Sequence, residues 1–148
     1  MYCMVFVAES GRVVDLEVTT QSSSSLLVHW VHPAQSNGLV QMYLMRYRLT
    51  GVGDCPLLDP PGSWSRLLDV DSNDLQAAIN DLLPYSHYQV KVWARTAAGR
   101  GKVGVAYANT AAAGLSVTLC LSVCLSSKIN ILLTICVPLN LHLVSSEQ

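Results

Sequence analysis

The acidic segment that starts at Asp69 has a residue spacing that could bind a metal ion. Asp69, Asp71 and Asn73 place oxygen ligands at alternate positions, as an EF-hand calcium loop does at its start. Such a loop needs glycine at its sixth position and glutamate at its twelfth, where this chain has Asp74 and Asn80. The sequence therefore favours an exposed turn and predicts no metal site.

Serine, histidine and aspartate all occur, but none has a catalytic setting. His29, His32 and His87 have no carboxylate or cysteine at ligand spacing, so ordinary surface or loop histidines are expected. No serine lies in a nucleophile elbow, and Gly99-x-Gly101 lacks the strand-to-helix setting of a phosphate-binding loop. We predict no catalytic residue, no metal and no cofactor, and hence a protein that is not an enzyme.

Composition argues against a disulfide-rich protein and against a nucleic-acid-binding protein. The five cysteines are scattered, with Cys55 alone inside the patterned region, and they predict free thiols and no disulfide framework. The net charge of -1 lacks the basic excess of nucleic-acid-binding proteins. The chain is 51% hydrophobic and only 13% charged, and this apolar excess is concentrated after residue 110.

The elements that must position any functional side chain are short strands. Alternating polar and apolar residues separated by turn residues predict seven of them, and no run is long and periodic enough for a helix. The predicted strands cover residues 16–19, 26–31, 40–48, 64–70, 77–82, 88–95 and 103–110. The pattern predicts an all-β, seven-stranded antiparallel sandwich over residues 12–110, after a poorly defined segment 1–11.

Several residues arrive in the order and at the spacing of a known family. Trp30 stands three residues before Pro33, a strand with alternating aromatic residues follows Asn37-Gly38, and Leu82-x-Pro84-Tyr85-Ser86-x-Tyr88 closes the series. In these features the chain resembles the fibronectin type III family, which has an immunoglobulin-like sandwich fold. Trp64 also stands where that family often has a tryptophan. The resemblance implies a structural core that includes Trp30, Tyr43, Tyr47, Leu82 and Tyr88, with the Tyr88 hydroxyl bonded to backbone near Leu82.

The resemblance also places the third predicted strand beside the Tyr88 strand in one sheet. The outward residues of these two strands would be Arg46, Arg48, Lys91, Trp93 and Arg95. A tryptophan flanked by cations is suited to cation–π stacking and is typical of binding hot spots. We expect a docking face for a protein partner or for an acidic glycan. The alternative is a solvated face on which neighbouring aliphatic stems cover Trp93.

The apolar tail over residues 111–148 has three interpretations. It could span a membrane near residues 111–131, although a span of that length has to include Lys128 and Asn130. It could add further sheet. The word Cys-Leu-Ser-Val restarts at Cys124, and this low-complexity repeat favours the third interpretation, a non-native read-through that is not part of the domain.

The resemblance implies a non-catalytic interaction or adhesion module of a cell-surface receptor, exposed outside the cell. Two alternatives stay open: a small single-pass membrane protein that displays one such domain, and a passive spacer. The first residues lack the basic start of a signal peptide, so we expect none there.

Overall fold

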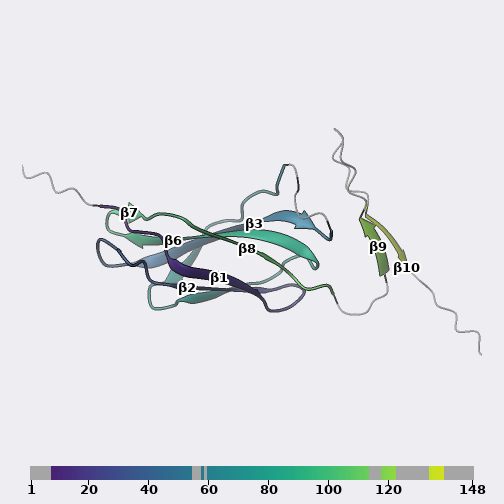
Figure 1. The fold of residues 1–148 in the computed structure, drawn as a ribbon, viewed down its shortest axis with the longest axis horizontal. Coiled ribbons are helices and arrows are strands. Elements are labelled where there is room, and N and C mark those ends of the chain that lie inside the picture. Colours follow the sequence, from purple (N-terminus) through teal and green to yellow (C-terminus); the bar gives the residue numbers. More distant parts are fainter. Residues whose placement is uncertain (1–7, 55–57, 59, 114–117, 123–133, 139–148) are drawn as a thin grey trace, which may run out of the picture. The chain divides into compact units, whose positions relative to one another are not determined.

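The computed structural model describes residues 8–54, 58, 60–113, 118–122 and 134–138 (Figure 1). The chain divides into two compact units, Met1–Ala112 and Ala113–Gln148. All regular structure in the described ranges is β-strand. These ranges contain no helix of the length and hydrophobicity that crossing a membrane requires.

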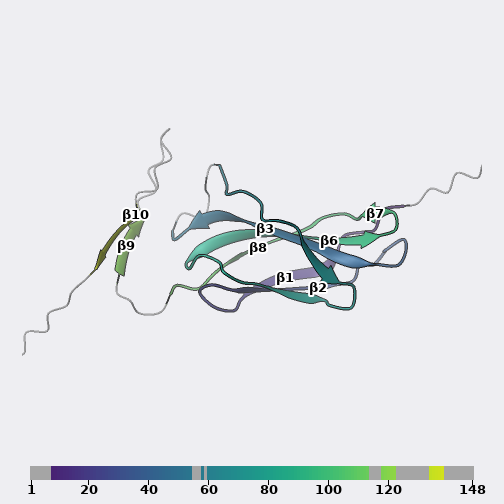
Figure 2. The ribbon, with the colours of Figure 1, turned by 180° about the vertical axis from the view of Figure 1, so that it is seen from behind.

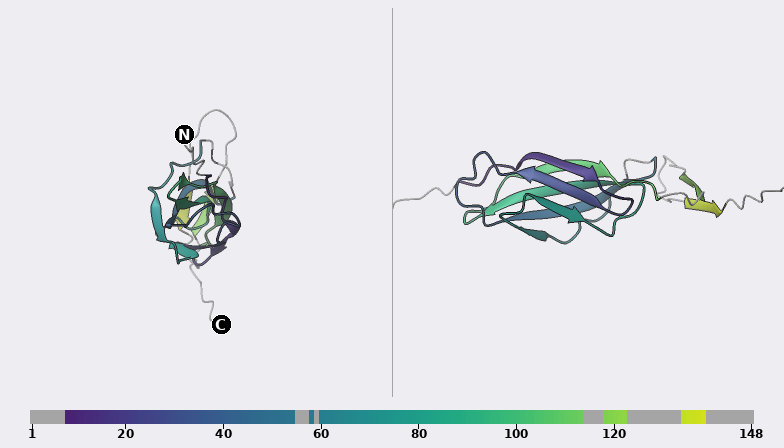
Figure 3. Two further views of the ribbon diagram at one scale, coloured as in Figure 1. Left: turned by 90° about the vertical axis from the view of Figure 1, so that its left-hand side faces the viewer. Right: turned by 90° about the horizontal axis from the view of Figure 1, so that it is seen from below.

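The first unit is a sandwich of two antiparallel sheets. One sheet has the order β1-β2-β5, and the other has the order β4-β3-β6-β7, with β8 also paired to β6. The strands are β1 (Val14–Thr20), β2 (Leu26–Val31), β3 (Met42–Val52), β4 (Leu68–Asp71), β5 (Gln76–Ile79), β6 (Ser86–Thr96), β7 (Gly99–Arg100) and β8 (Gly104–Asn109). Figures 1 and 2 show the layers from opposite sides, and Figure 3 shows them from an end and from below. The predicted all-β sandwich is confirmed.

The seven predicted strands are all present, with corrections at their ends. The fourth strand was expected to open at Trp64, but β4 begins at Leu68. The fifth was expected to reach Leu82, but β5 ends at Ile79, and Asp81 has a positive φ of 58° that ends the extended backbone. The short β7 was not expected as a separate strand; it forms the hairpin in which Thr96 pairs with Gly99.

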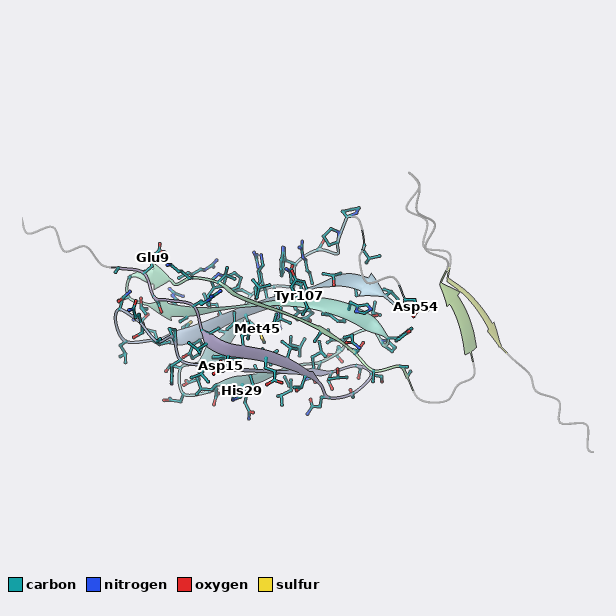
Figure 4. The ribbon with its side chains drawn as sticks, in the orientation of Figure 1. Glu9, Asp15, His29, Met45, Asp54 and Tyr107 are labelled. Atoms are coloured by element: carbon teal, nitrogen blue, oxygen red, sulfur yellow. The ribbon has the colours of Figure 1, made fainter. Side chains whose placement is uncertain are left out.

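The core lies between the sheets because successive side chains of a strand point to opposite faces, and one face of each sheet is turned inward. Along β2, Leu26, Val28 and Trp30 are buried, while His29 and Val31 are exposed. Of the five residues predicted for the core, four are buried and Tyr47 is half-buried against the same cluster. Met45, labelled in Figure 4, is buried between the sheets.

One aromatic contact joins the two sheets, and another lies within the larger sheet. The Trp30 and Tyr43 rings meet edge-on with centroids 5.3 Å apart, and Tyr47 meets Tyr88 in the same way at 6.2 Å. The Tyr43 hydroxyl lies 2.5 Å from His32 Nδ1, which gives this buried phenol a polar partner at the rim. The Trp30 indole Nε1 is buried with no hydrogen-bond partner among the described residues.

The turn before β6 is held by a buried tyrosine, as the resemblance implied. The Leu83 backbone N–H donates to the Tyr88 hydroxyl at 2.9 Å. Thr110 supports the same turn, because its Oγ1 accepts from the Ser86 N–H at 3.0 Å and donates to the Leu83 carbonyl at 2.7 Å. These bonds satisfy backbone groups that the turn removes from water.

The second unit contains a two-stranded antiparallel sheet. β9 (Thr118–Ser122) pairs with β10 (Thr134–Pro138), and Cys120 lies opposite Cys136 in the register. Most of the stretch that one interpretation assigns to a membrane span, including residues 123–131, lies outside the described residues. The membrane-span and read-through interpretations of the tail remain predictions.

We expect replacement of Trp30 by alanine to lower the free energy of unfolding by about 3–5 kcal/mol, because it leaves a large cavity between the sheets. Trp30→Phe should cost distinctly less, since it fills most of the space and removes the unpartnered indole N–H. Urea denaturation of the three proteins checks this. Equal losses for the two variants would contradict the packing described above.

Burial raises the pKa of Tyr43 and Tyr88, an effect that the Leu83 N–H partly opposes at Tyr88. A raised folded-state pKa leaves stability unaffected below the unfolded value of about 10 and lowers it as pH rises above that value. Unfolding free energies should therefore be level from pH 8 to pH 9.5 and fall beyond about pH 10. The fall should be shallower in Tyr43→Phe, and an equally steep fall there would exclude Tyr43 as a contributor.

Candidate partner-binding face

The outward face of the larger sheet is set by the pairing of β3 with β6. In this register Leu44 lies opposite Trp93, Arg46 opposite Lys91 and Arg48 opposite Gln89. Because successive side chains alternate between faces, these residues share the side of the sheet that points away from the core. Nitrogen-bearing side chains rise from this side in Figure 4, in which Tyr107 is also labelled.

A third row of this face comes from the segment just before β4. The Ser65 N–H donates to the Tyr47 carbonyl at 2.8 Å, and the Tyr47 N–H donates to Ser65 Oγ at 3.0 Å. The Gly62 N–H donates to the Leu49 carbonyl at 2.9 Å, and a Cβ on Gly62 would lie only 3.1 Å from that oxygen. This irregular pairing holds Trp64 beside β3 although Trp64 is not in a strand.

Trp64 is the centre of a tryptophan–cation stack. The guanidinium carbons of Arg46 and Arg48 lie 4.6 and 4.5 Å from its ring centroid, and Lys91 Nζ lies at 4.5 Å. Arg46 also lies 5.3 Å from the Trp93 ring. Three cations therefore share two indole rings within the distance at which cation–π attraction is significant. We call Arg46, Arg48, Trp64, Lys91 and Trp93 the tryptophan–cation stack.

Arg46 is the most constrained member of the stack. It contacts both indole rings, and its Nε is buried with no hydrogen-bond partner among the described residues. An arginine loses less by desolvation than a lysine does, because its charge is delocalised and weakly hydrated. The aromatic contacts thus replace the hydration that Arg46 loses.

A hydrogen-bonded chain continues from the stack across the sheet. Arg48 Nε donates to Gln89 Oε1 at 2.9 Å, and Gln89 Nε2 donates to the Tyr107 hydroxyl at 2.6 Å. Gln89 is only 7% exposed, so both of its amide atoms are fixed by these bonds. Arg48 is oriented by Trp64 on its face and by Gln89 at its edge.

The structure gathers four of the five predicted face residues and separates the fifth. Arg46, Arg48, Lys91 and Trp93 lie in the stack, whereas Arg95 is exposed and lies opposite Arg100 in the β6–β7 hairpin. Trp64, which the predicted face did not include, has three cation contacts, whereas Trp93 has one. Sequence reasoning placed Trp64 in a strand and missed this role; its half-burial is what distinguishes it from a core residue.

The charge on this face is predominantly positive. The register places two carboxylates there, Asp69 and Asp71, both on the edge strand β4. Strands β1, β2 and β5 of the other sheet contain no lysine or arginine. The cations on the outward face of the larger sheet are Arg46, Arg48, Lys91, Arg95 and Arg100.

The other candidate sites have structural roles in the described residues. Asp71 Oδ1 accepts from the Asn73 backbone N–H at 2.9 Å, which is the hydrogen bond of an exposed turn. Within the described ranges no three histidine, cysteine or acidic side chains are grouped so as to hold a metal ion. His29 is exposed as expected, whereas His87 is half-buried and bonded to the Gly53 carbonyl at 3.0 Å.

A double-mutant cycle of Arg46→Gln with Trp64→Leu should give a coupling energy of about 0.5–2 kcal/mol in unfolding free energy, because each change alone already removes the stacking contact. The matched pair Arg95→Gln with Trp64→Leu should give coupling near zero. Similar coupling in both pairs would mean that general charge effects, and not stacking, link these residues.

Comparison with known proteins agrees with this architecture. The family model described as "Fibronectin type III domain" matches residues 11–107. The chain is 32% identical over 92 residues to neural cell adhesion molecule L1 of Takifugu rubripes and 39% identical over 80 residues to ephrin type-B receptor 4b of Danio rerio. These matches cover 62% and 54% of this chain and 7% of each relative, so the chain spans a small part of their length.

Solved structures show the same fold. The third fibronectin III domain of human KIAA0343 protein matches with a TM-score of 0.60 and 19% identity, over 76% of this chain and 91% of that one. The FN5 domain of Drosophila Lar matches with a TM-score of 0.54 and 21% identity, over 70% and 99%. The sandwich, the tyrosine turn and the family match all lead to one conclusion. The chain belongs to the fibronectin type III domain family.

Proposed function

We propose that this domain is a protein-recognition module of a cell-surface receptor or adhesion protein, and that its partner docks on the tryptophan–cation stack. The observation that carries the proposal is the arrangement of Arg46 between Trp64 and Trp93 on the outward face of the larger sheet. Tryptophan and arginine are, together with tyrosine, the residues most enriched in binding hot spots.

Pre-organisation supports this proposal. Trp64 is held by backbone bonds around Ser65, and Arg48 is held by Gln89, so few side-chain rotations would be lost when a partner binds. Each flexible side chain that is already ordered avoids an entropy cost of about 0.5–1.5 kcal/mol. The stack presents flat, half-buried indole and guanidinium surfaces that a partner can cover without large rearrangement.

The charge on the face indicates an acidic partner surface. Five cations stand against two carboxylates there, and the carboxylates lie at the β4 edge. Complementary charge steers encounter and suppresses wrong partners. The association rate should therefore fall as salt concentration rises.

The relatives support the setting. Their names describe a neural cell adhesion molecule, an ephrin receptor and the tyrosine-protein phosphatase Lar, and the shared part is a domain-sized stretch of each. By analogy we place this domain outside the cell in a larger receptor. A fold is shared by many functions, so the argument for a docking site depends on the stack and not on the relatives.

The test is binding of the full chain, displayed as an oligomer, to an array of purified receptor extracellular domains. We expect at least one saturable interaction, weakened about 30-fold or more by Trp64→Ala or by Arg46→Gln, since hot-spot truncation costs about 2 kcal/mol or more. Arg12→Gln, a charge-matched change at an exposed residue, should leave binding unchanged. Thermal denaturation of each variant controls for folding.

Two results would contradict the proposal. Binding that is equally strong in the Trp64 and Arg46 variants would place the docking site elsewhere on the domain. A wild-type chain that binds no extracellular domain on the array would favour a passive spacer.

A further inference from the structure

A hollow of about 370 Å³ lies beside the stack on the outward face of the same sheet. Its floor comes from β3, β6 and β8, and its outer wall is Leu58 and Pro61 from the segment between β3 and β4. The Leu58 N–H donates to the Thr50 carbonyl at 2.5 Å, which holds that wall against β3. The volume is at the lower end of the range for small-molecule sites, so the hollow suits a ligand with a single ring and not a polymer.

Arg48 is the one lining residue that is charged at every physiological pH. Its Nε is occupied by Gln89, and its guanidinium lies over Trp64, so the terminal Nη groups are the donors that remain for a ligand. Two parallel Nη–H donors match the two oxygens of a carboxylate. A single arginine suits a ligand with one negative charge.

The other polar groups of the hollow include both donors and acceptors. The Tyr107 hydroxyl accepts from Gln89, which leaves its own proton to donate, and its ring belongs to a side chain that is 68% exposed. His87 Nε2 must donate to the Gly53 carbonyl, because a carbonyl only accepts, and so Nδ1 of the neutral ring is an acceptor. Asn109 and Thr50 also line the hollow, and each can donate and accept.

This mixture distinguishes between anionic ligands. A bare carboxylate needs only donors, and a sulfated chain needs several cations, whereas this hollow has one cation, hydroxyl and amide groups, and an exposed aromatic ring. From this combination we propose that the hollow binds a sugar acid, that is, one pyranose ring with a single carboxylate. The carboxylate lies on Arg48, the ring packs on Tyr107, and sugar hydroxyls bond to His87 Nδ1 and Asn109. The site is distinct from the two tryptophans and does not require a protein partner.

The test is NMR titration of the full chain, following the Arg48 Nε–H and Gln89 side-chain amide signals. The probes are the methyl glycosides of glucuronic acid and of N-acetylneuraminic acid, which separate uronic from sialic sources. At least one should give saturable shifts at millimolar concentration. Arg48→Gln should weaken binding about tenfold or more, because it removes the charge-assisted bonds. Tyr107→Phe, which keeps the ring and removes the exposed hydroxyl, should weaken it severalfold.

The charge-matched control is Arg95→Gln, which lies on the same face but does not line the hollow. Equal weakening by this change would overturn the proposal in favour of general electrostatic attraction. Equal shifts with methyl glucoside would show that the carboxylate is not recognised. Equal shifts with N-acetylglutamate would assign the hollow to an acidic protein side chain. Absence of saturable shifts with both sugar acids would also overturn it. Loss of Trp93 bears only on the protein-docking face, whereas loss of Trp64 also removes the ring over which Arg48 lies.

Discussion

The pairing of β3 with β6 is the constraint on which both the core and the outward face depend. The ladder runs from Met42 opposite Arg95 to Val52 opposite Ser86, and its alternation sends Tyr43 into the core and Arg46 outward. A slip of one residue would bury arginines and expose the aromatic residues, at the large cost of desolvating unpaired charge. Core and face are therefore two consequences of a single register, and neither can change without the other.

The outward face is completed by a departure from regular sheet. Between Gly62 and Ser65 the chain follows β3 without forming a strand, and a serine hydroxyl accepts the Tyr47 N–H in place of a backbone carbonyl. This local pairing satisfies the backbone and also fixes Trp64 above two arginines. The hollow beside the stack has the same origin, because its outer wall is the preceding part of that segment.

Some buried polar groups of the domain have hydrogen-bond partners and others have none. The turn at Leu83 is held by Tyr88 and Thr110, and the Tyr43 hydroxyl meets His32. Tyrosines with hydrogen-bonded hydroxyls thus stabilise both ends of the core, and their burial disfavours deprotonation. Two buried nitrogens, Trp30 Nε1 and Arg46 Nε, have no hydrogen-bond partner in the described part of the chain, and each belongs to a side chain that contacts an aromatic ring.

The sandwich and most of its core could be predicted from the sequence, because a period of two and the turn residues are local signals that do not depend on tertiary contacts. The sequence also determined which face of β3 and β6 carries cations. It could not locate Trp64, since that placement depends on hydrogen bonds from Tyr47, some 17 positions away, to an irregular segment. The hydrogen bonds that link Arg48, Gln89 and Tyr107 connect three strands, and they likewise could not be predicted from the sequence. Both placements depend on pairing between strands that are distant in the chain, and such pairing leaves no local pattern in the sequence.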